Sequence, residues 1–448
     1  MSFGLEQAGA LLEKATRRGA DAGDVFFVEG ETFSAQVRLG TVEKISSAKS
    51  KGLGLRLFFG TRSAIVSTSD LGGEALDRLL DDACALARHA EEDAFAGLPA
   101  PAACATTFPD LDLTDPDIGA LSVEEKIALA RRTETAALGY DPRMTNSEGG
   151  DFAHAHATIS YAASNGFCQR YAASSASLSA SPIATSDQGM QRDYWYSARR
   201  HLRHLASPES VGQTAARRTL RRLGARKVTT QQAPVIFDPE TAASLLGHLA
   251  SALSGYALYK GASFLAGRLG ETIAAPSVTL HDDPTLPTGL GSRPFDGEGL
   301  PALKKKIVEN GVLQSYLLDT YSGRKLGLPS TGNAVRGTSD SPSVGVANFH
   351  MAPGPHTPDE IIASVRSGLY VTELIGFGVN TTTGDYSRGV CGLWIENGAL
   401  AYPVEEITIA GNLKEMFRQI EMIGSDLDPH KSLSAPTLKI ARMTLAGA

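Results

Sequence analysis

The chain has 448 residues, of which 42 % are hydrophobic and 20 % charged, and its formal net charge is −7. This composition is typical of a folded globular protein and excludes general disorder, and the acidic balance argues against general affinity for nucleic acid. The sequence shows neither a signal peptide nor the roughly 18 consecutive apolar residues of a membrane span, so we expect a cytoplasmic protein without membrane contact. The four cysteines form no CxxC pair, and we expect them to be reduced.

Residues 1–95 are predicted to form one α+β unit. Leucine and alanine recur at helical spacing over residues 5–18 and again over 72–91, which predicts two amphipathic helices. Between them, residues 24–38 and 51–67 alternate polar and apolar side chains and are rich in β-branched and aromatic residues, as antiparallel strands are. The order of helix, sheet and helix predicts a layer of helices on a small sheet.

Residues 96–228 form the second predicted region, and they begin with an alanine- and proline-rich linker. Neither a helix nor a strand can run through that linker, because proline lacks the backbone N–H that both need. Ser122 and Glu125 then form a capping-box pattern that begins a helix ending near Leu138.

The rest of this region is predicted to be a β-meander over residues 143–205, built of small and polar side chains. Asn165-Gly166 is a strong signal for a hairpin turn within it. The region ends in a helix near 209–223 with several arginines at spacings of three and four residues. We expect this basic helix face to be solvated.

Residues 229–448 form the third predicted region, which is mainly β. A short apolar strand over 234–237 precedes a helix over 239–257, whose start is marked by Asp238 followed by proline. Of the later segments, only 413–423 is expected to be a helix. The predicted strands are 278–283, 303–319, 342–351, 368–379, 390–396 and 399–411.

The fold class predicted for the whole chain is therefore α+β. Its N-terminal half should combine helices with antiparallel sheets in layers. Its C-terminal half should be a mainly antiparallel, barrel-like β domain that carries an inserted helix pair.

Histidines and one cysteine are the first candidates for chemistry. His154 and His156 should point to one face of a strand, so they could form half of a metal site. His201 and His204 could supply the other half, but nothing in the sequence brings the pairs together, and ordinary core or surface histidines are the alternative. Cys391 could be a nucleophile, but its strand-like surroundings favour a packed thiol.

Acidic residues are the second candidates. Asp282, Asp283, Asp296 and Glu298 could bind a hard cation or act as an acid and base pair. Acidic loops more often hold turns, which is the alternative. His248 is the only ionisable side chain in the interior of the helix over 239–257, and a hydrogen-bonded histidine beside the core is the expectation for it.

Several blocks of sequence, in one order along nearly the whole chain, carry a family resemblance. They are Pro234-Val-Ile-Phe-Asp238, Leu246-Gly-His248, Ser263-Phe-Leu265, Phe295-Asp-Gly-Glu-Gly299, Leu317-Leu-Asp-Thr-Tyr321, Arg324-Lys-Leu-Gly327, Ser330-Thr-Gly-Asn-Ala334, Val379-Asn-Thr-Thr-Thr-Gly-Asp385, Ser387-Arg388 and Pro403-Val-Glu-Glu-Ile-Thr-Ile-Ala-Gly-Asn-Leu413. In these blocks the chain resembles the TldD/PmbA family, and within it the TldE (PmbA) type. The resemblance implies a peptidase made of two related subunits.

One subunit of that family carries a zinc-binding HExxxH helix and a cysteine ligand near its C-terminus. In this chain the first histidine of the motif falls at Gly247, the glutamate at His248 and the second histidine at Ala252, and no cysteine follows Ser434. A catalytic zinc needs about three protein ligands and a base. The resemblance thus implies that this chain has no catalytic residue, no metal and no cofactor of its own, and that zinc belongs to the partner subunit.

The favoured hypothesis is a non-zinc subunit that pairs with a TldD-like, zinc-bearing homologue. The pair would degrade or mature peptides and unfolded segments, and this chain could form a homodimer when alone. One alternative is a stand-alone hydrolase that uses the histidine pair or the carboxylates described above. Another is a modulator associated with gyrase or nucleic acid, which only the basic helix and the family's older description favour.

A polar segment over 379–388 lies between two apolar strand patterns and is longer than an ordinary hairpin loop. We hypothesise that it lines a substrate cavity shared with the partner, with Asn380, Thr382, Asp385 and Arg388 as the candidate contacts. Asn380 and Arg388 would donate hydrogen bonds to peptide carbonyl oxygens, and Asp385 would fix the loop through backbone amides. A surface loop held by its own side chains is the alternative.

Overall fold

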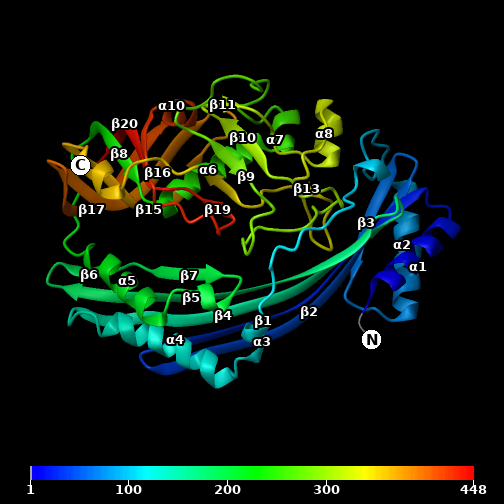
Figure 1. The fold of residues 1–448 in the computed structure, drawn as a ribbon, viewed down its shortest axis with the longest axis horizontal. Helices are drawn as coiled ribbons and strands as arrows, with labels where there is room; N and C mark the ends of the chain where they lie inside the picture. Colours follow the sequence, from blue (N-terminus) through cyan, green and yellow to red (C-terminus); the bar gives the residue numbers. More distant parts are fainter. Residues whose placement is uncertain (1–2, 448) are drawn as a thin grey trace.

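The structure is a computed structural model that describes residues 3–447, and two halves are visible in it (Figure 1). One half is a long, curved antiparallel sheet with helices packed on it, and the other contains a small barrel and a shorter sheet. The predicted α+β class and the barrel-like C-terminal region are therefore confirmed. Within residues 3–447, the helices are all too short or too polar to span a bilayer.

The long sheet has the strand order β3-β2-β1-β4-β5-β6, and β7 pairs with β5. β1 pairs with β4 from Asp24 to Val37, so strands from the first and second predicted regions share one sheet. The predicted turn at Asn165-Gly166 joins β4 to β5, and Gly166 adopts the positive φ of 96° that glycine allows. The strands are β1 (Ala22–Arg38), β2 (Thr41–Phe59), β3 (Arg62–Thr68), β4 (Met144–Ala163), β5 (Cys168–Ser186), β6 (Gly189–Arg192) and β7 (Trp195–Arg199).

Helices cover the two ends of the long sheet separately. Two helices form one apolar core with β1 and β2, and three others form a second core with β1, β4 and β5. Ser122 and Glu125 form the predicted capping box, in which each side chain bonds to the backbone N–H of the other. The helices are α1 (Leu5–Arg17), α2 (Gly73–His89), α3 (Pro116–Ala120), α4 (Val123–Leu138) and α5 (Pro208–Leu220), with short 3-10 turns at Pro101–Ala103 and Leu202–His204.

Five strands of the C-terminal half close into a barrel in the order β17-β16-β15-β8-β20, because β20 pairs back onto β17. One further strand, β18, extends the sheet from β20. The elements are β8 (Gln231–Phe237), α6 (Pro239–Leu253), β15 (Ser367–Val379), β16 (Asp385–Glu396), β17 (Ala399–Asn412), α10 (Leu413–Arg418), β18 (Ile420–Ile423) and β20 (Leu438–Ala446).

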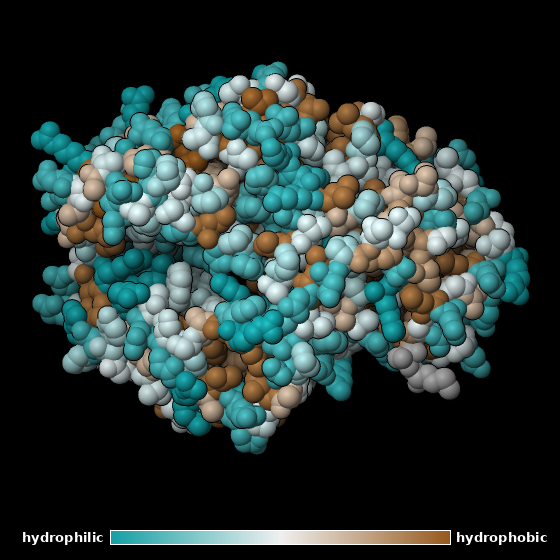
Figure 2. Space-filling view, viewed as in Figure 1, coloured by the Kyte–Doolittle hydropathy of each residue, from teal (hydrophilic) through white to brown (hydrophobic). Residues whose placement is uncertain are grey.

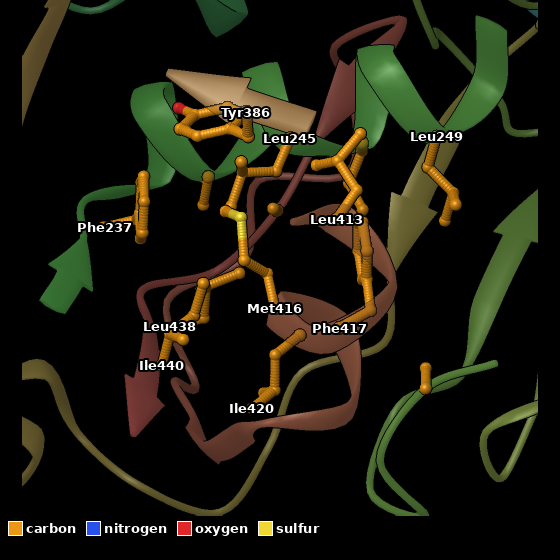
Figure 3. Packing of buried hydrophobic residues seen from close by; sticks show 14 of the residues in the cluster. Phe237, Leu245, Leu249, Tyr386, Leu413, Met416, Phe417, Ile420, Leu438 and Ile440 are labelled. Carbon is orange, nitrogen blue, oxygen red and sulfur yellow. The ribbon is translucent and has the colours of Figure 1, made fainter. Parts of the chain in front are cut away.

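Apolar side chains of α6 and α10 fill the core beside this barrel. Figure 3 shows Leu245 and Leu249 of α6 close to Leu413 and Phe417 of α10, and these side chains are all buried. Full burial of one such side chain is worth about 1.5–3 kcal/mol. This packing therefore fixes which side of α6 faces inward.

A shorter sheet and three small helices complete the C-terminal half. The sheet has the strand order β11-β10-β9-β14-β19, and β12 pairs with β13 separately. The elements are α7 (Gly255–Tyr259), β9 (Leu280–Asp282), β10 (Lys305–Glu309), β11 (Val312–Leu313), α8 (Thr320–Leu326), β12 (Ala334–Val335), β13 (Ser343–Val344), β14 (Phe349–Met351), α9 (Pro358–Ala363) and β19 (Leu433–Ser434).

Several predictions for this half were wrong in extent. The strand over 303–319 is limited to β10 and β11, and the helix over 413–423 ends at Arg418 and is followed by a strand. The helix over 239–257 breaks at Ser254, whose backbone is extended and bridges to Leu317. Helices α8 and α9 were missed because six or seven residues are too few to show helical periodicity.

The basic helix is not solvated as predicted, because some of its arginines are buried between the halves. The guanidinium of Arg218 lies 3.4 Å from Asp193 and 3.3 Å from Asp238. Arg222 follows the helix and pairs with Glu373 of β15. These arginines bind the C-terminal half of the same chain, which leaves them unavailable to nucleic acid.

One buried carboxylate, Asp24, joins the long sheet to the C-terminal half. Arg336 follows β12 and donates to Asp24 Oδ1 at 2.9 Å, and both side chains are fully buried. Arg56 of β2 donates to Oδ2 at 3.0 Å, and the hydroxyl of Tyr161 lies 3.3 Å from the same oxygen. Burial raises the pKa of Asp24, but the charges of Arg336 and Arg56 outweigh it and hold the pKa below its usual range.

We predict that Asp24→Asn lowers the free energy of unfolding by roughly 3–5 kcal/mol, because two guanidinium groups lose their buried carboxylate. Urea denaturation followed by circular dichroism measures the change. Because the folded pKa of Asp24 is depressed, its contribution is present above the unfolded pKa near 4 and lost as the pH falls through the folded value. The wild type should therefore lose more stability than the variant on acidification.

Asp77→Asn is the matched control, since Asp77 pairs with Lys14 at the surface. This variant should leave the urea midpoint unchanged. Equal midpoints for the two variants would contradict a joining role for Asp24.

Candidate functional site

Helix α6 holds the positions at which the sequence departs from a zinc motif. Asp238 caps the helix by accepting a hydrogen bond from the Thr241 N–H at 2.9 Å, and Pro239 occupies the first turn. This is the predicted helix start. Because the core fixes the rotation of α6, the surroundings of each motif position are also fixed.

Gly247, His248 and Ala252 face different surroundings. Gly247 lines a cavity of about 470 Å³, where an added Cβ would lie 3.2 Å from Cδ2 of Leu433. His248 lies beside β16, and Ala252 is completely buried in the core. Zinc takes nitrogen, sulfur or carboxylate oxygen ligands arranged around one point, and Gly247, His248 and Ala252 do not supply such a set. Within residues 3–447, no three His, Cys, Asp or Glu side chains come together as a metal site.

His248 contacts two residues of β16. Its ring centroid lies 6.1 Å from that of Tyr386, and its Nε2 atom lies 3.4 Å from a guanidinium nitrogen of Arg388. Burial first, and then the charge of Arg388, lowers the pKa of His248 below its usual value. The imidazole is thus neutral at pH 7 and can accept the hydrogen bond from Arg388.

The four candidate carboxylates are buried and serve as backbone acceptors, which is the structural alternative stated above. Each accepts a hydrogen bond from at least one main-chain N–H: Asp282 from Ala347, Asp283 from Thr285, Asp296 from Glu298 and Leu300, and Glu298 from Thr320. They hold loops together. Glu298 differs from the others because it also lines a cavity.

The candidate histidines and cysteine also have structural surroundings. His154 is buried and stacks on Phe33, with ring centroids 5.6 Å apart. His201 is buried, and its Nε2 atom lies 2.9 Å from the carbonyl oxygen of Asp112. Burial raises the pKa of Cys391 to about 11, so its thiol is protonated at neutral pH. His201 Nε2 also lies 3.1 Å from a carboxylate oxygen of Asp112. Among the described residues, none of these three side chains belongs to a metal-binding cluster.

The predicted loop over 379–388 is shorter in the structure. β15 continues to Val379 and β16 begins at Asp385, so the turn contains only residues 380–384. Asn380 Oδ1 accepts from the N–H groups of Thr382 and Thr383, and Asp385 accepts from the Thr383 hydroxyl at 2.6 Å. The amides are thus held by Asn380, and not by Asp385 as predicted.

Arg388 lies inside strand β16, where it is buried, and not in the loop. Its Nε donates to the carbonyl oxygen of Ile375 on the neighbouring strand β15, where the register of the pairing shifts. The side chain lines a cavity of about 230 Å³ between the barrel and β7, together with Tyr194, Tyr196 and Ser244. Figure 2, viewed as Figure 1, shows the surface hollowed where the barrel half meets the long sheet.

A second cavity, of about 320 Å³, lies at the opposite part of the boundary between the halves. Tyr256, Tyr259 and Tyr321 line it, and the hydroxyl of Tyr321 donates to Asp93 at 2.7 Å. Burial, followed by the charge of Asp296, raises the pKa of Glu298 in its wall to about 7. These tyrosines lie far from Asp93 in the sequence and form no local motif, although Tyr321 ends one of the blocks that carry the family resemblance.

Comparison with known proteins defines the class to which this fold belongs. Sequence models of the PmbA/TldA metallopeptidase family match the chain in three parts: domain 1 over residues 23–87, the central domain over 116–223 and the C-terminal domain over 230–447. The fold is thus that of a family of proteins described as metallopeptidases. The chain belongs to this PmbA/TldD family.

Individual relatives agree with this assignment. The chain is 38 % identical to "Metalloprotease PmbA" of Escherichia coli O157:H7 over 99 % of its length and 96 % of the relative's. A "Metalloprotease TldD homolog" of Haemophilus influenzae is 30 % identical over 42 % of each chain.

Two solved structures share the fold across the chain. A Bacteroides thetaiotaomicron protein, described as a candidate modulator of DNA gyrase, superposes with a TM-score of 0.92 at 30 % identity, covering 99 % of both chains. TldE of Thermococcus kodakarensis superposes with a TM-score of 0.89 at 21 % identity, covering 98 % of this chain and 99 % of that one. At that identity, the second match concerns the fold alone.

We predict that Glu298→Gln stabilises the protein relative to the wild type as the pH rises. The folded pKa of Glu298, about 7, exceeds the ordinary value near 4.3 of the unfolded chain, so the wild type loses stability between those pH values. Glutamine cannot ionise, and the advantage of the variant should grow by roughly 1–3 kcal/mol from pH 5 to pH 8. Urea denaturation at each pH measures it.

Glu74→Gln is the control, because the side chain of Glu74 is 96 % exposed. It should follow the wild-type pH dependence. A Glu298→Gln profile parallel to that of the wild type would show that Glu298 titrates normally in the fold.

Proposed function

We propose that this chain is the non-zinc subunit of a two-subunit metallopeptidase. Its partner would be a TldD-like homologue that carries the HExxxH helix and the zinc. The assembled pair would cleave peptides or unfolded segments, and this chain would contribute part of the surface that holds them.

The occupants of the motif positions on α6 are the observation that carries this proposal. The metallopeptidase fold is present along the chain, yet Gly247 and Ala252 have no ligand atoms and His248 bonds to Arg388. Water activation by zinc requires ligands that converge and leave one position open. A subunit that contributes to substrate binding is compatible with these residues, whereas a self-sufficient zinc hydrolase is not.

The barrel strands offer one surface for this role. Peptidases that accept diverse sequences often bind a peptide as an added strand, because main-chain hydrogen bonds do not depend on side-chain identity. In the proposal, Asn380 and Thr382 at the exposed tip of the β15–β16 hairpin contact the peptide or the partner, and Asp385 braces that tip. Arg388, in strand β16, contributes a guanidinium to the cavity beside the hairpin.

The alternative functions have less support. A stand-alone hydrolase would need the carboxylates or histidines described above, and those side chains hold loops and pack in the core. A nucleic-acid modulator would need accessible basic residues, and Arg218 and Arg222 are paired with acidic residues of the same chain.

The test is to express the tagged chain together with an HExxxH homologue from the same host. We expect the two chains to co-purify with one zinc per pair and to cleave peptides only when paired. Metal analysis of the isolated chain should find no stoichiometric zinc. Replacing the motif glutamate of the homologue should abolish cleavage while the pair still assembles.

His156→Ala in this chain is the matched control, since a hydrolase centred on the histidine pair would lose activity. We expect the two-chain complex that contains His156→Ala to keep its peptidase activity. Peptide cleavage by the isolated chain, lost in this variant, would overturn the proposal.

A further inference from the structure

The side chain of Arg388 is a buried charge without a counter-ion. Only 8 % of the residue is exposed, and its hydrogen bonds go to the carbonyl oxygen of Ile375 and to His248. Both acceptors are neutral, since burial and Arg388 lower the pKa of His248. Among the residues that the structure describes, no carboxylate pairs with this guanidinium. A buried guanidinium is normally paired, because the desolvation of an isolated charge costs several kcal/mol.

The other charged groups in the wall of the 230 Å³ cavity already have partners. Glu373 pairs with Arg222, and Glu240 pairs with Lys431 and accepts from the hydroxyl of Tyr196 at 2.9 Å. Arg218 pairs with both Asp193 and Asp238. Arg388 is therefore the charge in this wall that remains available to a ligand.

The remaining wall is amphipathic and sits between the two halves. Tyr194 and Tyr196 stack with ring centroids 6.4 Å apart, and Trp195 lies between them in the chain. Ser244 of α6 adds a hydroxyl one helical turn before His248. The volume is below the usual 300–1,000 Å³ of ligand pockets, so the cavity suits one or two residues at the end of a peptide.

We infer that this cavity binds the C-terminal carboxylate of a peptide through Arg388, with the tyrosines against the last side chain. A single guanidinium matches the charge and the planar shape of one carboxylate, whereas a phosphate dianion would call for a second free cation. The inference deepens the proposed function, from which it takes the peptide as the ligand. It gives the metal-free chain a specific task, which is to anchor the end of the substrate.

The test uses the isolated full-length chain and two fluorescein-labelled pentapeptides that differ only in a free carboxylate or a carboxamide at the C-terminus. Fluorescence anisotropy should show the free acid binding at least roughly tenfold more tightly, as expected for a hydrogen bond to a charged group. A third peptide, amidated but with glutamate as its last residue, separates a terminal carboxylate from a side-chain carboxylate. Inorganic phosphate as competitor separates both from a general anion site.

Arg388→Gln should remove the preference for the free acid, because glutamine keeps a donor for Ile375 but loses the charge. Arg442→Gln, at an exposed arginine, is the control and should keep it. Ser244→Glu should also remove the preference, since it places a carboxylate on the wall of the same cavity. It should raise the melting temperature too, by giving Arg388 a counter-ion, so loss of binding is not confused with unfolding.

Equal binding of acid and amide by the wild type, or no binding of either, would overturn the inference. So would a preference that survives in Arg388→Gln. If the glutamate-ended amide binds preferentially, or if phosphate at equal concentration displaces the peptide, the site binds anions in general and the inference of a terminal-carboxylate site is overturned. Because these measurements need no partner, they do not depend on whether a zinc-bearing homologue assembles with this chain.

Discussion

The contact between Asp24 and its two arginines is the interaction on which the arrangement of the halves depends. Arg56 reaches Asp24 from within the long sheet, while Arg336 reaches it from the C-terminal half, so one carboxylate neutralises charge from both. In a buried setting these charges cannot exchange their partners for water. Any displacement of the halves that separates Arg336 from Asp24 leaves the buried guanidinium of Arg336 without its counter-ion, while Asp24 keeps Arg56. The cavities along the boundary therefore keep their shape.

The barrel core has a comparable effect on α6. Leu245, Leu249 and Ala252 are buried against α10 and the strands, so Gly247 and His248 face outward on neighbouring sides of the helix. A helix in this place can present ligands to a metal only from its outward positions. In this chain one of those positions lacks a side chain and the other bonds to Arg388. The buried side chains therefore fix the position of α6, and its outward side chains determine what the helix can bind.

Much of the fold could be predicted from the sequence, because long elements repeat a pattern many times. The alternation over residues 24–38 and the capping box at Ser122 and Glu125 each correspond to an element in the structure. Short elements such as α8 and α9 have only their capping boxes as a signal in the sequence, and a capping box alone does not distinguish a helix from a turn. The basic helix was misjudged because spacing reveals which residues share a face but not what covers that face.

The candidate site was harder to predict, for a related reason. Polarity and glycine content suggested a long loop over 379–388, but β15 pairs with β16 as far as Val379 and Tyr386, which places Arg388 within a strand. The pairing of Arg218 with Asp193 and Asp238, and that of Arg222 with Glu373, link residues far apart in the chain. These long-range ion pairs leave no local pattern in the sequence. The unpaired state of Arg388 is visible only after all these pairs have been identified.

Under the proposed function, the position of Arg388 would explain how this chain contributes binding energy for the substrate. In an exposed ion pair, the attraction between the charges is largely cancelled by the loss of their hydration. Folding has already removed most water from Arg388, which Ile375 and His248 hold in place with neutral acceptors. A carboxylate that enters the cavity meets a donor that needs neither further desolvation nor ordering. Such a site favours the C-terminus of a peptide over an internal segment, because only the C-terminus carries the carboxylate that Arg388 needs as a counter-ion.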